Sequence, residues 1–187
     1  MKPKSYAAAL GQVLEPMGFT REGKLWTRVR GDLWERVGLQ VSQIAGVTAN
    51  LSIKDLETER LLQEAIPSKG EPVVMIPITV RIGTLMDGYD HWWLRDPNGP
   101  SELAEAVRIH AAPFFDRVRT LEDQAAKWFG RGSTKGWRPP SKIYLAITLY
   151  RMGELEEACR ALSSPPKHIV YGWLSQVESV RQWLGCS

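Results

Sequence analysis

The chain has 187 residues, of which 43% are hydrophobic and 24% charged, and its formal charge is +3. These values are typical of a globular protein and exclude a disordered chain. A domain of this size buries most of its apolar surface, so it needs neither a disulfide nor a metal to fold. No apolar run approaches the roughly 20 residues of a membrane span, and Gly11 and Gln12 interrupt the apolar stretch 6–14, which argues against a signal peptide. We expect a cytoplasmic protein without membrane contact.

The first third of the chain predicts one helix and then a meander of strands. Apolar residues at helical spacing predict a helix over 5–15 with Ser5 as its N-cap. After it the period changes to two, which predicts antiparallel strands over 25–30, 33–43 and 47–53.

The turn Gly31-Asp32 is short enough to fix the register of the first two strands. It places Trp26 opposite Val37, where we expect a core ring. It also places Arg28 opposite Glu35, where we expect an ordinary cross-strand ion pair.

The remainder predicts one more strand and a series of helices. The alternation over 76–82 predicts a strand that lies at an edge or only begins at Pro77, because proline cannot donate a ladder hydrogen bond. A helix should run over 101–117, kinked or divided by Pro113. Further helices are expected over 55–65, 119–129, 142–151, 154–162 and 170–184. The fold class is α+β: an antiparallel meander of about four strands packed against helices, with an all-helical C-terminal extension.

Two cysteines are present, and neither is expected to form a disulfide. Cys159 lies in a helical pattern, where a buried thiol is the usual arrangement. Cys186 is next to last in the chain, where ends fray. Their spacing matches neither a secreted disulfide framework nor a zinc site.

Several short motifs occur in an order that resembles a known family. They are Leu14-Glu-Pro-Met-Gly-Phe-Thr-Arg-Glu-Gly, Trp26-Thr-Arg, Val37-Gly-Leu-Gln-Val-Ser, Ala49-Asn-Leu-Ser, Arg81-Ile-Gly, Trp92-Trp93 and Ala112-Pro-Phe-Phe. Over residues 5–130 this order resembles an uncharacterised bacterial family, domain-of-unknown-function family 4304. The resemblance implies a fold and no established activity.

A second resemblance is local. The run Leu145-Ala-Ile-Thr-Leu-Tyr-Arg-Met-Gly-Glu-Leu-Glu-Glu-Ala resembles the junction between the two helices of a tetratricopeptide unit. One junction is not a repeat array, because such units need about three copies to be stable. We predict a helical hairpin near 142–163, and a division into a sheet domain over 1–130 and a helical extension over 131–187 that packs on it as one structural unit.

The aromatic loop 87–100 holds the first candidate site. Its Asp87, Asp90, His91 and Asp96 match no metal cage, so we predict no metal and no cofactor. Trp92 and Trp93 are adjacent, and neighbouring residues on extended backbone point to opposite sides. One ring could enter the core while the other stays accessible, where it could anchor an interface; the interpretation we favour is that both rings are structural. With His91 and Arg81 they are candidate binding residues.

The segment 117–151 holds the second candidate site. It carries eight basic and two acidic residues, a charge of +6, so the rest of the chain is −3. Arg131, Lys135 and Arg138 lie there among aromatic residues, a combination that can track a nucleic-acid backbone. The alternative is a solvated basic face.

No nucleophile motif, metal-ligand spacing or P-loop is present in the sequence. The first functional hypothesis is therefore a non-enzymatic protein-binding module, similar to an immunity protein. The second is a nucleic-acid-associated protein that uses the basic segment. The third is a cryptic enzyme, for which Asp90 and His91 would be the site.

Overall fold

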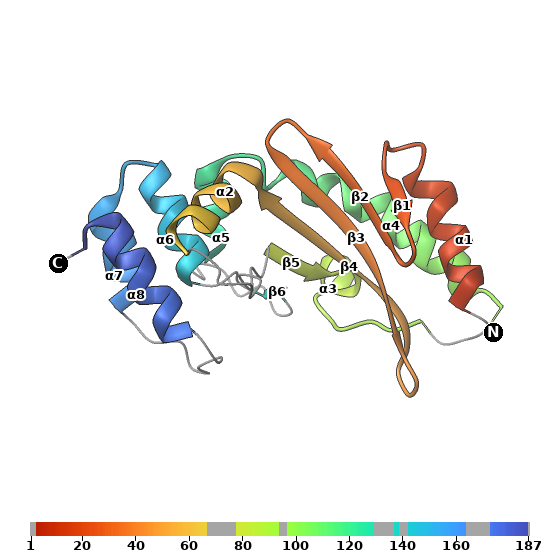
Figure 1. Ribbon diagram of the computed structural model, residues 1–187. Helices are drawn as coiled ribbons and strands as arrows, with labels where there is room; N and C mark the ends of the chain where they lie inside the picture. The colour runs from red at the N-terminus through yellow and green to blue at the C-terminus, as the bar shows by residue number, and fades with distance from the viewer. Residues whose placement is uncertain are drawn as a thin grey trace. The chain divides into compact units, whose positions relative to one another are not determined.

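In the computed structural model, which describes residues 3–66, 78–93, 97–128, 137–138, 142–163 and 173–186, six strands form a sheet in the order β1-β2-β3-β4-β5-β6 (Figure 1). The strands are β1 (Thr20–Glu22), β2 (Leu25–Arg30), β3 (Leu33–Ser42), β4 (Gly46–Asp55), β5 (Ile78–Arg81) and β6 (Trp137–Arg138). The α+β prediction is confirmed, with two short strands, β1 and β6, that the sequence did not indicate.

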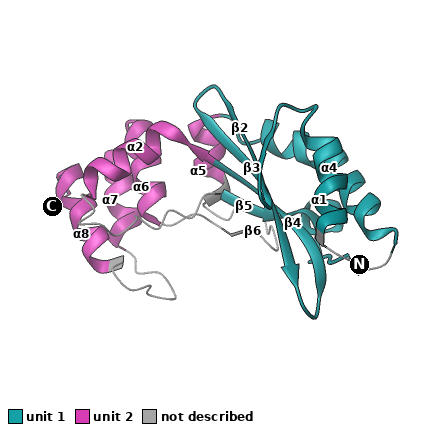
Figure 2. Ribbon diagram, turned by 45° about the vertical axis from the view of Figure 1, so that its right-hand side comes forward, with its two compact units in different colours: residues 1–53, 78–119, 132–138 teal, residues 54–77, 120–131, 139–187 magenta. Residues whose placement is uncertain are grey.

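The chain divides into two compact units (Figure 2). The sheet unit comprises residues 1–53, 78–119 and 132–138, and the helical unit comprises 54–77, 120–131 and 139–187. The helical unit thus includes two helices that precede residue 131 in the chain. The expected boundary near 130 falls outside the described residues, and the packing of the extension as one structural unit stays a prediction.

Three helices belong to the sheet unit: α1 (Pro3–Leu14), α3 (Ile82–Asp87) and α4 (Gly99–Asp116). Helix α1 begins at Pro3, so Ser5 lies inside the helix and is not its cap; proline suits a first helical turn, where its missing N–H has no partner to lose. Helix α4 passes through Pro113 as one continuous element, which excludes the expected division there.

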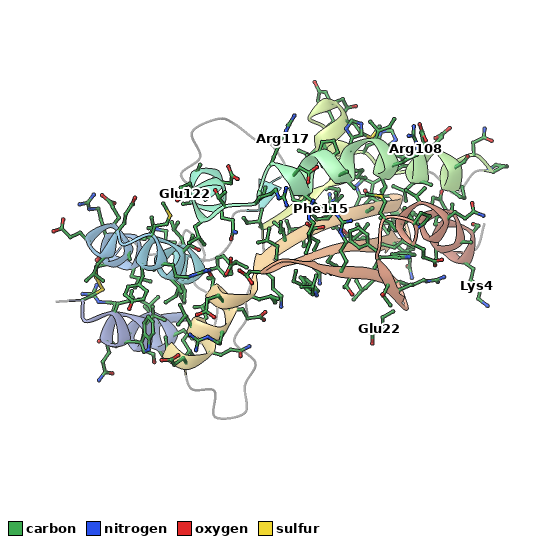
Figure 3. All side chains as sticks on the ribbon, turned by 90° about the horizontal axis from the view of Figure 1, so that it is seen from above. Lys4, Glu22, Arg108, Phe115, Arg117 and Glu122 are labelled. Carbon is green, nitrogen blue, oxygen red and sulfur yellow. A yellow bond between two sulfur atoms is a disulfide. The ribbon has the colours of Figure 1, made fainter. Side chains whose placement is uncertain are left out.

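The core of the sheet unit lies between one face of the sheet and the helices. Trp26 is fully buried and pairs in register with Val37, as the short turn predicted. Phe115 of α4 is also fully buried, and Figure 3 shows it on the side of α4 that faces the strands. Its ring lies 5.8 Å from that of Phe19, centroid to centroid, which ties α4 to the segment before β1.

Strand β5 lies inside the sheet and not at its edge. It pairs antiparallel with β4 on one side and with β6 on the other. Its described part is Ile78–Arg81, and the expected start at Pro77 lies outside the described residues. Ile82, expected to continue the strand, instead begins α3.

The helical unit contains α2 (Leu56–Ala65), α5 (Leu121–Trp128), α6 (Lys142–Arg151), α7 (Leu155–Ser163) and α8 (Trp173–Leu184). Helices α6 and α7 follow one another across a short turn. Gly153 turns the chain between them at φ 83°, a conformation that glycine adopts without steric cost. Buried side chains from α2, α6, α7 and α8 form the core of this unit, among them Leu62, Ile147, Leu162 and Val180.

A disulfide joins Cys159 of α7 to Cys186, just after α8 (Figure 3). The prediction of two unpaired cysteines is therefore wrong. Packing of α8 beside α7 brings their Cα atoms to 5.6 Å, a normal separation for a disulfide, although the two residues are 27 positions apart. In the sequence Cys186 appeared free to fray because this packing could not be seen from either helix alone.

Candidate functional site

The two faces of the sheet carry different chemistry. Because successive side chains of a strand alternate, the residues between the core positions share the other face, which we call the polar face. It includes Leu25, Thr27 and Val29 of β2, Trp34, Arg36, Gly38 and Gln40 of β3, Thr48, Asn50, Ser52 and Lys54 of β4, and Thr79 and Arg81 of β5.

Arg81 is held from three directions on the polar face. Its Nη1 donates to the Asp90 carboxylate, and its Nη2 lies 3.4 Å from Gln40 Oε1. Its guanidinium lies over the Trp92 ring, 5.0 Å from the ring centroid, in a cation–π contact. Asn50 donates to the same Gln40 oxygen at 2.9 Å. Each side chain is therefore fixed by its neighbours.

We call Gln40, Asn50, Arg81, Asp90 and Trp92 the Arg81–Trp92 surface. Trp92 is half-buried, whereas the Asp90 side chain is 55% exposed. Tyr89, next to Asp90, is exposed as well. The surface thus offers an aromatic ring, a guanidinium and a carboxylate at the protein exterior.

The segment that carries Trp92 is fastened to β4. Trp93 and Val47 exchange backbone hydrogen bonds of 2.8 and 2.9 Å, and Thr48 Oγ1 donates to the His91 carbonyl at 3.1 Å. This pairing turns Trp93 to the core face, where it is buried, and Trp92 to the polar face. Trp93 is thus a core ring and Trp92 is half-buried on the opposite face, and an interface role of Trp92 stays a prediction.

Gly83 is what allows His91 to lie so close to α3. A Cβ atom at this position would come within 2.5 Å of both the backbone nitrogen and the Cβ of His91. Real Cβ atoms do not approach backbone that closely, so only glycine fits here without a shift of one segment. The close contact helps to set the position of the Trp92 segment.

Arg36 occupies a different environment on the same face. Its guanidinium lies 5.4 Å from the centroid of the Trp34 ring, and its Nη2 donates to Ser52 Oγ at 3.3 Å. Ser52 in turn shares a 3.0 Å hydrogen bond with Thr79 Oγ1. Burial lowers the pKa of Arg36, although an arginine remains protonated throughout the physiological range.

On the core face, Glu35 is fully buried and binds two arginines. Arg28 Nε donates to Glu35 Oε2 at 2.6 Å, and Arg30 Nε donates to Oε1 at 2.9 Å. Arg28 also donates to the Met17 carbonyl at 2.5 Å, and Arg30 to Asp116 at 2.6 Å. The expected ordinary ion pair of Arg28 and Glu35 is thus one half of a shared, buried network.

Some residues of the predicted basic segment 117–151 are exposed at the surface, whereas Arg151 pairs with other residues of its own unit. Arg117 and Arg119 are exposed, and Figure 3 shows Arg117 pointing away from the sheet. Arg151, in contrast, is taken up inside the helical unit, where it pairs with Asp55 at the start of α2 and donates to Thr58 Oγ1 at 2.8 Å. It is therefore not available to a partner.

The structure brings together only some of the predicted site residues. Arg81 and Trp92 are in contact, and the His91 ring packs at 4.4 Å from that of Trp93. Arg131 and Lys135 lie outside the described residues. Arg138 belongs to β6 and pairs in register with Thr79, but its side chain is not described.

Asp90 and His91, the pair proposed for a cryptic enzyme, have different partners. The Asp90 carboxylate binds Arg81, and the imidazole of His91 contacts Trp93. Within the described ranges, no group of three His, Cys, Asp or Glu side chains could hold a metal ion. Asp96 of the expected polar cluster lies outside them. Among the described helices, none combines the length and hydropathy needed to cross a membrane.

The sequence did not indicate Trp34, Arg36, Gln40 or Ser52 as site residues. The signal was present in the alternation of β3 and β4, which places these residues opposite the apolar positions. The residues that alternate with the apolar core positions of each predicted strand could have been grouped as one face and considered as a site.

Comparison with known families shows a match to the model described as Domain of unknown function (DUF4304) over residues 10–129, more than half of the chain. The chain belongs to the DUF4304 family. The resemblance noted in the sequence is thereby confirmed, while the tetratricopeptide resemblance stays a prediction. No curated protein and no solved structure matches the chain. The matched range of this DUF4304 protein contains the whole Arg81–Trp92 surface.

Proposed function

We propose that this DUF4304 protein is a non-enzymatic module that binds another protein, and that the Arg81–Trp92 surface is where it does so. The observation that carries the proposal is the half-buried Trp92 ring stacked at 5.0 Å on an arginine that Asp90 and Gln40 hold in place. Tryptophan, tyrosine and arginine supply most of the residues that dominate binding energy in protein interfaces.

The fixed geometry adds support. A surface whose side chains are already ordered loses less conformational entropy when a partner binds, which increases affinity. Trp92 is ordered by Arg81, and its backbone is ordered by the bridge between Trp93 and Val47. An immunity protein, which acts by binding a toxin, is one kind of module that this proposal includes.

Affinity capture from the cells that encode the protein tests the proposal. The wild-type chain should retain a protein that Arg81→Ala and Trp92→Ala lose, with affinity for the purified partner reduced at least about tenfold, since hot-spot truncations cost about 2 kcal/mol or more. Ile109→Ala is the matched control, because Ile109 is an exposed apolar residue on α4. It should bind normally.

The same capture separates the two binding hypotheses. Retention that disappears after nuclease treatment and weakens steeply with salt would favour the nucleic-acid alternative. That result, or a partner held equally well by Trp92→Ala, would contradict the proposal.

A further inference from the structure

Within the part of the chain that the structure describes, Arg36 differs from the other arginines of strands β2–β5 in having no carboxylate partner. Arg28 and Arg30 pair with Glu35, and Arg81 pairs with Asp90. Among the described residues, Arg36 contacts only the Trp34 ring and the Ser52 hydroxyl through polar or cation–π interactions. It therefore carries a positive charge that this part of the chain does not neutralise.

This unneutralised charge is also partly removed from water. Arg36 Nε is shielded from solvent and lacks a hydrogen-bond partner, and the Ser52 side chain to which Nη2 donates is itself fully buried. Keeping a charge in such a place costs free energy unless an opposite charge arrives. The cost suggests that Arg36 serves binding and not the fold.

The charge count indicates the kind of anion. Arg81 on the same face is already neutralised by Asp90, and Lys54 at the end of β4 pairs with Glu59 at 2.5 Å. Among the described side chains of this face, Arg36 is thus a cation without a counter-charge, which matches the single charge of a carboxylate, whose two oxygens also fit the paired N–H groups of a guanidinium.

The position of Arg36 connects it to the Arg81–Trp92 surface. Ser52, which binds Arg36, is paired with Thr79, and the next pair on the same face is Asn50 with Arg81. Two residues along a strand span roughly 7 Å. A protein seated on Trp92 would therefore be within side-chain reach of Arg36.

We infer that Arg36 is a receptor for an aspartate or glutamate side chain of the partner protein, and that it lies beside the Arg81–Trp92 surface. This inference rests on the proposed function. It assigns the partner a defined chemistry: an acidic residue close to the segment that contacts Trp92.

Nuclear magnetic resonance titration tests the receptor without the natural partner. The probe is the capped tripeptide N-acetyl-glycyl-glutamyl-glycinamide, and its glutaminyl counterpart is the matched control. The glutamyl peptide should shift the Arg36 Nε–H signal and the amide signals of Ser52 and Thr79 in a saturable manner. Arg36→Gln should weaken this binding at least tenfold, whereas Arg108→Gln, on α4 and paired with Glu105, should leave it unchanged.

Parallel titrations with sodium acetate, inorganic phosphate and sodium chloride at equal ionic strength complete the test. Tighter binding of phosphate than of acetate would overturn the assignment of a carboxylate. Binding of acetate but not of the glutamyl peptide would overturn the assignment of a protein side chain. If the glutamyl and glutaminyl peptides bound equally well, Arg36 would not be a carboxylate receptor. The same conclusion would follow if Arg36→Gln bound the glutamyl peptide as tightly as the wild type. None of these results affects the capture by Trp92, so the two proposals fail separately.

Discussion

On the core face of the sheet, Arg28 and Arg30 share the buried Glu35 carboxylate. On the polar face, Arg36 contacts the Trp34 ring and the Ser52 hydroxyl and, among the described residues, no carboxylate. The strands are the same and the residue type is the same. On the core face both arginines are neutralised within the fold, whereas on the polar face Arg81 is neutralised by Asp90 and Arg36 has no carboxylate among the described residues.

The difference separates charges that maintain structure from charges that are open to a partner. Removing one member of a buried ion pair leaves the other as an unpaired buried charge. The substitution therefore lowers the free energy of unfolding strongly, even where the intact pair contributes little net stability. Removing an arginine that pairs with no described carboxylate leaves no unpaired buried charge behind. Its removal should leave the fold intact and affect only what binds there.

The largest expected effect is at Glu35. Glu35→Gln should lower the free energy of unfolding by about 3–5 kcal/mol, because it leaves two arginines without a buried counter-charge. Urea denaturation measures this change. Glu22→Gln is the matched control on exposed β1, and it should change stability by less than about 0.5 kcal/mol. If both substitutions changed the free energy of unfolding equally, the buried Glu35 carboxylate would contribute no more to stability than the exposed Glu22.

The next effect concerns the segment that carries Trp92 on one face and Trp93 on the other. Gly83→Ala should destabilise the protein by about 1–3 kcal/mol and shift the amide signals of residues 90–93, because the added methyl group meets the His91 backbone. Gly11→Ala is its control. There the new methyl group meets only the flexible Glu15 side chain, so the helix should gain about 0.5–1 kcal/mol. A tolerated Gly83→Ala would show that the close contact does not position Trp92.

A smaller effect, in the opposite direction, is expected at Arg36. Arg36→Met should leave the free energy of unfolding unchanged or raise it by up to about 1 kcal/mol, since an apolar residue of similar volume replaces an unneutralised charge. Arg28→Met, the same substitution on the core face, should be clearly destabilising. A marked loss of stability in Arg36→Met would mean that Arg36 is structural and would break the comparison.

The smallest effect is the pH dependence of the Arg30–Asp116 pair. The hydrogen bond from Arg30 lowers the pKa of Asp116, so the folded state binds a proton at Asp116 less readily than the unfolded state does. The pair therefore stabilises the fold above the unfolded pKa of about 3.9, and this contribution disappears as the pH falls through the lower folded value. Denaturation at pH 6 and pH 3 should show a small deficit of Asp116→Asn that shrinks at the lower pH. A deficit of equal size at both pH values would contradict this account.

Local rules predicted the parts of the fold that depend on neighbours in sequence. A two-residue turn fixes register, so the pairs Trp26–Val37 and Arg28–Glu35 followed from the position of Gly31-Asp32. The alternation of extended backbone separated Trp92 from Trp93 in the same way. These inferences needed no knowledge of distant segments.

The parts that sequence did not predict depend on long-range packing. Arg30 reaches Asp116 on a helix 86 positions away, and this contact leaves no periodic signal in the sequence. The bond between Cys159 and Cys186 depends on how α7 and α8 pack. The contribution of Thr79 and Arg81 to the polar face depends on the pairing of β5 with β4, which alternation within single strands does not give.

The Cys159–Cys186 disulfide makes the C-terminal part of the chain a closed covalent ring of residues 159–186. A protease that cut one peptide bond inside this ring would not release a fragment. The nicked protein would migrate as one molecule in a denaturing gel without reductant and as two pieces after reduction. The ring thus provides a physical label, readable by electrophoresis, for whether the thiols of a given sample have been oxidised.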